Sequence, residues 1–130
     1  MIDTVIQHLL ETTIDSPIKL QLCLLFYENR QLEGTAAQLA NRVYRDIWST
    51  REALRELAED GILAETAAGG EPSYHYRPHA HYADPMFRLV QSYNEPFERD
   101  QIQRLLHDIA SYARYVRTDH RSGGFELQSL

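Results

Sequence analysis

The sequence predicts a mainly α-helical fold with one small β-hairpin, and three observations support this class. Residues 34–62 are expected to form two helices joined by a tight turn. Residues 62–66 and 73–77 have the composition of two strands, and the segment AAGGEP between them is typical of a turn. Apolar residues also recur at helical spacing before and after this region, which predicts additional N- and C-terminal helices.

The helix pair carries recognisable start and stop signals. Thr35 and Gln38 have the spacing of a capping box, in which each side chain accepts a hydrogen bond from the backbone amide of the other residue. Asp46 is the expected N-cap of the second helix, and Gly61 is expected to end that helix in a left-handed conformation. The residues expected to face the core are Ala36, Leu39, Ala40 and Val43 in the first helix and Ile47, Thr50, Leu54, Leu57 and Ala58 in the second.

The order helix, helix, hairpin resembles the winged helix-turn-helix of transcriptional regulators of the broad MarR and ArsR kind. The segment LRELAEDGILAE looks like the recognition helix of that superfamily running into its wing, and the resemblance covers roughly residues 17–78. It implies a DNA-binding regulator whose helix 47–60 lies in the major groove of duplex DNA. The predicted wing tip departs from the pattern, because it carries Gly69, Gly70 and Glu71 where many wings carry Lys or Arg.

The chain divides into four segments: an N-terminal helix in residues 1–14, the winged helix-turn-helix in 15–78, C-terminal dimerisation helices in 79–118 and a flexible tail in 119–130. Ser16 is a strong helix start, and the helix that follows it, 18–27, is apolar on nearly every side, which predicts burial. The C-terminal helices are expected over 85–93, with Asp84 as the N-cap, and over 97–117.

The resemblance assigns DNA contacts to the outer face of the second helix and to the basic residues around it. The residues expected at base edges are Trp48, Ser49, Arg51, Glu52 and Arg55. Those expected at phosphates are Arg42, Arg45 and Arg77. The alternative for the helix face is a solvated surface with Glu52–Arg55 and Arg55–Glu59 ion pairs. For Trp48 the alternative to a contact with DNA or protein is a side chain tucked under Tyr44 or the wing.

The net negative charge of the chain favours an alternative to DNA binding. The formal net charge is −6, and residues 15–78 hold 7 basic and 10 acidic groups, so the predicted DNA-binding segment is acidic too. Phosphate contacts supply most non-specific affinity for DNA, so binding would need a local basic face. The alternative is a protein–protein interaction module that keeps the winged-helix scaffold without binding DNA. Glu71 and the row Glu52, Glu56 and Glu59 favour it.

A wide apolar stripe on the last helix predicts a homodimer. The stripe consists of Ile102, Leu105, Leu106, Ile109, Tyr112, Ala113 and Val116. Two copies packed about a two-fold axis would cover both stripes and set the two helices 47–60 about one DNA turn apart, roughly 34 Å. The alternative is a monomer in which the C-terminal helices fold back over residues 18–27.

The remaining signals predict neither catalysis nor a cofactor, since no nucleophile motif, Gly-rich phosphate loop or dinucleotide fingerprint is present. His75, His79 and His81 could bring two imidazoles to a metal, but surface histidines in a polar connector explain the spacing more simply. Cys23, the single cysteine, is expected to pack as a small hydrophobe, with redox sensing as the less favoured alternative. The sequence has neither a long apolar segment nor a signal peptide, which predicts a cytoplasmic protein without membrane contact.

Overall fold

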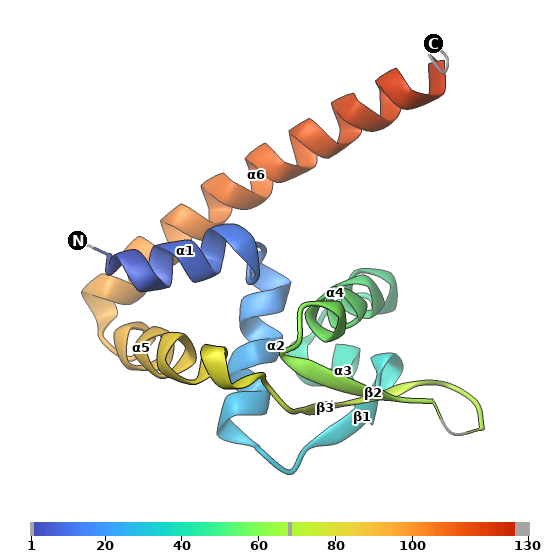
Figure 1. Ribbon diagram of the computed structural model, residues 1–130, viewed down its shortest axis with the longest axis horizontal. Helices are drawn as coiled ribbons and strands as arrows, with labels where there is room; N and C mark the ends of the chain where they lie inside the picture. The colour runs from blue at the N-terminus through green and yellow to red at the C-terminus, as the bar shows by residue number, and fades with distance from the viewer. Residues whose placement is uncertain (1, 68, 127–130) are drawn as a thin grey trace.

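The computed structural model describes the backbone of residues 2–67 and 69–126, and the side chains of this part of the chain up to residue 112. The described residues are mainly helical and contain one small antiparallel sheet, as the sequence predicts (Figure 1). The α-helices are α1 (Thr4–Thr12), α2 (Pro17–Glu28), α3 (Ala36–Val43), α4 (Ile47–Glu59), α5 (Ala83–Tyr93) and α6 (Pro96–Glu126). The strands are β1 (Glu33–Thr35), β2 (Leu63–Thr66) and β3 (Ser73–Tyr76), and a short 3₁₀ helix, η1 (Ala80–Tyr82), precedes α5.

The sheet has three strands in the order β1-β3-β2, with every neighbouring pair antiparallel. Tyr74 of β3 lies opposite Gly34 of β1 on one side and opposite Glu65 of β2 on the other. The hairpin of β2 and β3 matches the prediction, whereas the sequence predicts no strand at β1. The segment EGT has no alternating pattern of its own, and β3 supplies its hydrogen-bonding partners from far along the chain.

Most of the predicted helix signals are confirmed. Thr35 and Gln38 form the capping box, and the carboxylate of Asp46 accepts the amide of Ser49 at the start of α4. Gly61 has a φ of 91°, and beyond it the amide of Ile62 donates to the carbonyl of Leu57 at 3.0 Å. This closed turn leads α4 directly into β2.

The predicted start of α5 is wrong. Asp84 was expected to cap this helix, but α5 begins at Ala83, and Tyr82 holds the cap position without a side-chain hydrogen bond. The 3₁₀ helix η1 runs into α5 and supplies the preceding turn. Asp84 therefore lies in the first turn of α5, where its carboxylate accepts a hydrogen bond from Arg88 Nε at 2.8 Å.

Helix α2 lies at the centre of the core and contacts α3, α4, α6 and β3. Leu22 and Phe26 of α2 have no exposed surface, which confirms the predicted burial of this helix on several sides. Cys23 is also fully buried, and burial raises the pKa of its thiol to about 12. It packs as a small hydrophobic side chain, as expected, and stays protonated at neutral pH.

The first half of α6 packs against α1, α2 and α5, and the rest extends away from the body of the protein (Figure 1). Ile102 is fully buried and Leu106 is 1% exposed within the single chain. Both therefore belong to the core and not to an open face, which corrects the dimer-interface prediction for these two residues. The helix continues to Glu126, past its predicted end at 117, so only residues 127–130 of the predicted tail lie outside the described residues.

The rest of the predicted stripe remains at the surface or outside the described side chains. Leu105 and Ile109 are half-buried, and Tyr112 is 71% exposed. Ala113 and Val116 lie in α6 beyond the last residue whose side chain is described. Within the described part of the chain, no helix combines the length and the apolar composition that crossing a bilayer requires.

The burial of Leu54 in the core leads to the first testable prediction. Leu54 has no exposed surface, so Leu54→Ala should leave a cavity and lower the free energy of unfolding by about 2–5 kcal/mol. Leu32→Ala is the matched control, because Leu32 is only half-buried and the same truncation should cost less there. Urea unfolding of the three proteins measures both values. An equal loss in the two variants would contradict the burial of α4 against α2.

Candidate nucleic-acid interface

The turn between α3 and α4 carries a cluster of arginines and exposed aromatic rings, which we call the α3–α4 corner. Its members are Arg42, Tyr44, Arg45, Trp48 and Arg51. Tyr44 is 94% exposed and Trp48 is 74% exposed, although both are large and mainly apolar. Exposed apolar groups that gather at one place often mark a contact with another molecule. The predicted alternative, in which Trp48 is tucked under Tyr44 or the wing, is therefore wrong.

Tyr44 is held in an unfavourable backbone conformation. It is the C-cap of α3 with φ 58° and ψ 45°, and it is the one non-glycine residue with positive φ in the described part of the chain. A left-handed conformation costs an L-residue other than glycine about 1–2 kcal/mol. With almost all of its side chain in solvent, Tyr44 gains little packing energy in return. Strain of this kind is often found at functional sites, which makes Tyr44 a candidate that the sequence analysis missed.

Two of the three arginines in the corner form no ion pair with a described carboxylate. Arg42 has no such pair, and the Nε of Arg45 donates to the Oε1 of Gln21 at 2.7 Å. Arg51 lies against the Trp48 ring, with its guanidinium carbon 5.4 Å from the ring centroid. It also reaches the β2–β3 turn, where its Nη2 is 3.2 Å from the Oε2 of Glu71. Both members of that ion pair are half-exposed, so the pair is weak and can exchange.

The middle of α4 is chemically different from its first turns. The Nη2 of Arg55 is 2.6 Å from Glu52 Oε2, and its Nη1 is 2.7 Å from Glu59 Oε2. The charge of Glu52 comes first among the influences that raise the pKa of Arg55, followed by the hydrogen bond to Glu59. These are the intrahelical pairs of the solvated-face alternative, and the structure confirms them. Arg55 is thus paired on two sides within its own helix, and base recognition by Arg55 would require both of these exposed pairs to exchange.

A buried ion cluster fixes α4 to α2. The side chain of Lys19 is 6% exposed, and its Nζ lies 2.9 Å from Asp15 Oδ1 and also contacts Glu56 Oε1. Burial alone would lower the pKa of Lys19, but the bonds to Glu56 and Asp15 outweigh burial and raise that pKa above its ordinary value. Glu56, which was grouped with the exposed acidic row, is thereby drawn toward α2. This cluster adds to the packing of α2 against α4, the helix that begins in the corner.

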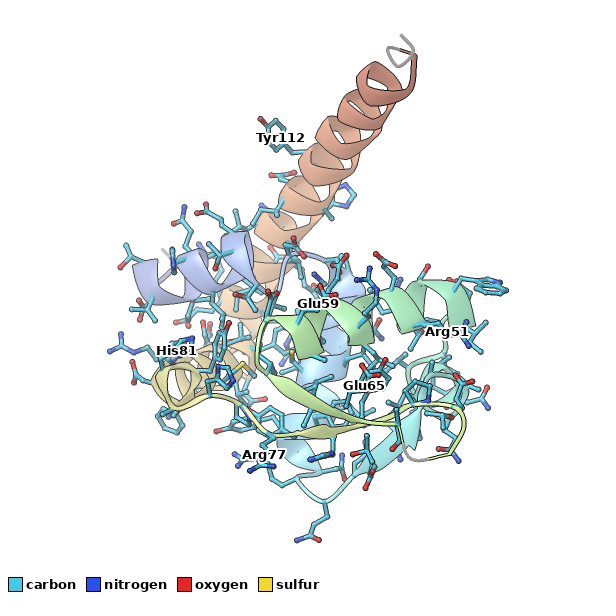
Figure 2. The ribbon with its side chains drawn as sticks, turned by 45° about the vertical axis from the view of Figure 1, so that its right-hand side comes forward. Arg51, Glu59, Glu65, Arg77, His81 and Tyr112 are labelled. Carbon is cyan, nitrogen blue, oxygen red and sulfur yellow. The ribbon has the colours of Figure 1, made fainter. Side chains whose placement is uncertain are left out.

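The predicted contacts therefore separate into three groups. Arg42, Arg45, Trp48, Ser49 and Arg51 lie together at or next to the corner. Glu52 and Arg55 lie further along α4 and bind each other. Arg77 follows the last residue of β3, and Figure 2 shows it at the opposite end of the hairpin from Arg51. Arg45, Arg51, Arg55 and Arg77 therefore do not form one continuous basic stripe.

His79 and His81 form an exposed pair, whereas His75 is half-buried. His79 and His81 have ring centroids 5.9 Å apart, and His81 also packs on Tyr82 with a centroid distance of 4.2 Å. His75 lies in β3. Among the residues that the structure describes, no group of three or more His, Cys, Asp or Glu side chains is arranged to hold a metal ion.

The corner has the chemistry of a binding surface. Guanidinium groups donate several hydrogen bonds at fixed angles to phosphate oxygens and base edges, and aromatic rings stack on planar groups. Comparison with known proteins adds nothing to this inference: no protein-family model, curated protein or solved structure matches the chain. The function must therefore be inferred from the residues of the chain itself.

The strained backbone conformation of Tyr44 leads to the second prediction. Tyr44→Gly should raise the free energy of unfolding by about 0.5–1 kcal/mol, because glycine adopts the left-handed conformation without a steric cost. Tyr44→Ala keeps the strain and removes the ring, so it is the matched control and should not stabilise the protein. Thermal unfolding of the two variants provides the comparison. A less stable Tyr44→Gly variant would mean that the tyrosine side chain stabilises the fold.

Proposed function

We propose that this chain is a winged helix-turn-helix protein that binds duplex DNA through the α3–α4 corner and thereby regulates transcription. The fold assignment is supported by the element order α2-β1-α3-α4-β2-β3, in which a helix-turn-helix is followed by a hairpin. The pairing of β1 with that hairpin adds further support, because it ties the first strand to the wing. In the proposed fold, α4 is the recognition helix.

The observation that carries the proposal is the opposite charge of the two ends of α4. Arg42, Arg45 and Arg51 lie in or beside the turn at its N-terminal end and outnumber the N-cap Asp46 there, whereas Glu52 and Glu59 pair with Arg55 further along. In helix-turn-helix proteins the N-terminal residues of the second helix approach the base edges. The end that would enter the major groove is thus the basic end, although the chain as a whole has a net charge of −6.

Each group in the corner has a role in this proposal. Arg42 and Arg45 bind phosphates, and the hydroxyl of Tyr44 donates to a phosphate oxygen beside them. Arg51 exchanges Glu71 for a base edge, since their exposed ion pair is weak. Trp48 and Ser49 lie next to Arg51 at the groove. Arg55 and Arg77 have no part in the contact, which differs from the assignment that the resemblance implies.

A second candidate function is a protein–protein interaction module on the same scaffold. The carboxylates of Glu52 and Glu59 favour it, because they make the middle of α4 a poor surface for a polyanion. The exposed rings of Tyr44 and Trp48 are compatible with both functions, since aromatic residues are enriched in protein interfaces as well.

The chain offers an internal probe for DNA binding, because Trp48 is its single tryptophan and lies in the corner. Titration with a pool of random-sequence duplexes at low salt should change the emission of Trp48. Arg45→Ala should weaken binding to all sequences alike and reduce the slope of log affinity against log salt by about one unit, because one phosphate contact is lost. The measurement is the salt dependence of this titration.

Arg104→Ala is the matched control for Arg45→Ala. Arg104 is a highly exposed arginine on α6, paired with Asp100 and remote from the corner, so its removal should leave the salt slope unchanged. An unchanged Trp48 emission at every duplex concentration would disprove DNA binding by the corner. Binding that does not weaken with salt would also contradict the proposed phosphate contacts.

We extend the proposal to a homodimer formed by the part of α6 that leaves the body. Leu105 and Ile109 are half-buried, Tyr112 is exposed, and Ala113 and Val116 continue the same spacing along the helix. A two-fold axis between two such helices would cover these residues in both chains. It would also present two corners to one face of a duplex, about 34 Å apart if they bind successive major grooves.

The proposed homodimer leads to the fourth prediction, which concerns the mass of the protein in solution. The intact chain at micromolar concentration should have the mass of two copies, and Tyr112→Glu should have the mass of one copy, because the change places a charge in the proposed interface. The exposure of Tyr112 in the single chain means that this variant should still fold. His107→Glu is the control on the opposite side of α6 and should remain a dimer. Light scattering measures these masses, and a monomeric mass for the intact chain excludes the dimer.

A further inference from the structure

A groove of about 550 Å³ lies between α2, the C-terminal end of α3 and the segment that joins α5 to α6. On the α2 side, its lining residues are spaced as a single helix face: Gln21, Leu24, Leu25 and Glu28. Leu24, Leu25 and Val90 form an apolar floor that the fold buries only in part. Helix α2 is otherwise covered on several sides, and this face is one part of its apolar surface that the described residues leave accessible.

The groove combines this apolar floor with positive charge. Arg42 and Arg99 line it, and neither forms an ion pair with a described carboxylate. The Nε of Arg99 donates to the carbonyl oxygen of Tyr93 at 2.7 Å, and its guanidinium carbon lies 5.5 Å from the Tyr93 ring centroid. Arg45 lies close by, through its bond to Gln21. Glu28 is the single carboxylate among the described residues that line the groove.

Arg42 and Arg99 share the lack of a described carboxylate partner with Arg30, Arg45 and Arg77, but they are the two arginines that line this groove. Arg51, Arg55, Arg88 and Arg104 each form an ion pair with at least one described carboxylate. The chain has six more acidic than basic groups, so acids for further pairs are plentiful. Arg42 and Arg99 nevertheless keep their charge uncompensated beside an apolar surface.

We propose that this groove binds an acidic peptide segment of another protein. A large apolar side chain of the peptide packs on Leu24, Leu25 and Val90, and its carboxylates pair with Arg42 and Arg99. A DNA backbone would satisfy the arginines but has no apolar group to fill the floor, whereas an acidic peptide with an apolar residue satisfies both. This function goes beyond DNA binding. It would also couple to DNA binding, because Arg42 belongs to both surfaces.

The test begins with a random peptide library displayed on phage and selected against the full chain. The enriched peptides should combine Asp or Glu with Leu, Ile, Phe or Trp. Synthetic, fluorescently labelled copies are then titrated with the protein, and polarisation gives their affinities. Arg99→Ala should weaken binding about tenfold, because one charge-assisted pair is lost. Enrichment of no acidic sequence, or an unchanged affinity for the Arg99→Ala variant, overturns the proposal.

A second variant is needed because Arg99 also holds the turn between α5 and α6 through Tyr93. Glu28→Gln removes the one groove carboxylate, which is exposed, and should tighten binding of the acidic peptides about twofold by relieving repulsion. Glu65→Gln is the matched control, an exposed glutamate in β2 that does not line the groove, and it should leave the affinity unchanged. A peptide bound elsewhere on the chain would not respond to Glu28→Gln, which would overturn the proposal.

Two other occupants give different results. If a second copy of the chain fills the groove, Arg99→Ala lowers the mass measured by light scattering. If duplex DNA fills it, Arg99→Ala weakens the titration followed by Trp48 emission. Either result overturns the peptide proposal. Because neither Arg99 nor Glu28 belongs to the proposed DNA contacts, a failure of DNA binding leaves the peptide measurements fully interpretable.

Discussion

The burial of α2 is the constraint on which the rest of the structure depends. This helix is apolar nearly all round, so it is stable only where other elements cover several of its faces. The sheet and α3 and α4 cover part of it, and α6 covers another part. Lys19, the basic residue of α2, is buried as well and is held by Asp15 and by Glu56 of α4. The position of α4 is thus supported by packing against α2 and by the ion pair between Glu56 and the buried Lys19.

The α3–α4 corner follows from the same arrangement. The apolar faces of α3 and α4 point toward the core, so the short turn between them must project into solvent. Tyr44 closes α3 in a left-handed conformation, and Trp48 lies in the first turn of α4 with most of its surface exposed. Strain and exposed aromatic surface are both unfavourable for an isolated chain, and a partner that covers the corner would bury the rings and so offset the cost of the strain. The proposed peptide groove differs from the corner in its chemistry. It exposes an aliphatic face of α2 beside arginines that have no described carboxylate partner, whereas the corner exposes aromatic rings.

The net charge of the chain does not show how its positive and negative side chains are distributed over the surface. The net charge of −6 argues against a polyanionic partner, yet the acids of α4 are largely engaged with Arg55 and Lys19. Arg42 and Arg45 are left without carboxylate partners at one edge of the described structure, next to the groove that Arg99 lines. A protein can therefore be acidic overall and still present a local surface that attracts phosphate or carboxylate groups.

The sequence by itself determined the class of the fold, most helix boundaries and the ion pairs along α4, because these depend on residues within one or two turns of each other. The caps at Ser16, Thr35 and Asp46 are of this kind. Only the tertiary structure decided which surfaces meet. Strand β1 exists because β3 lies beside it, Arg77 is separated from the corner by the length of the hairpin, and Ile102 is buried by helices of its own chain. Helical spacing shows that a residue must be covered, but the covering element depends on the path of the whole chain through space.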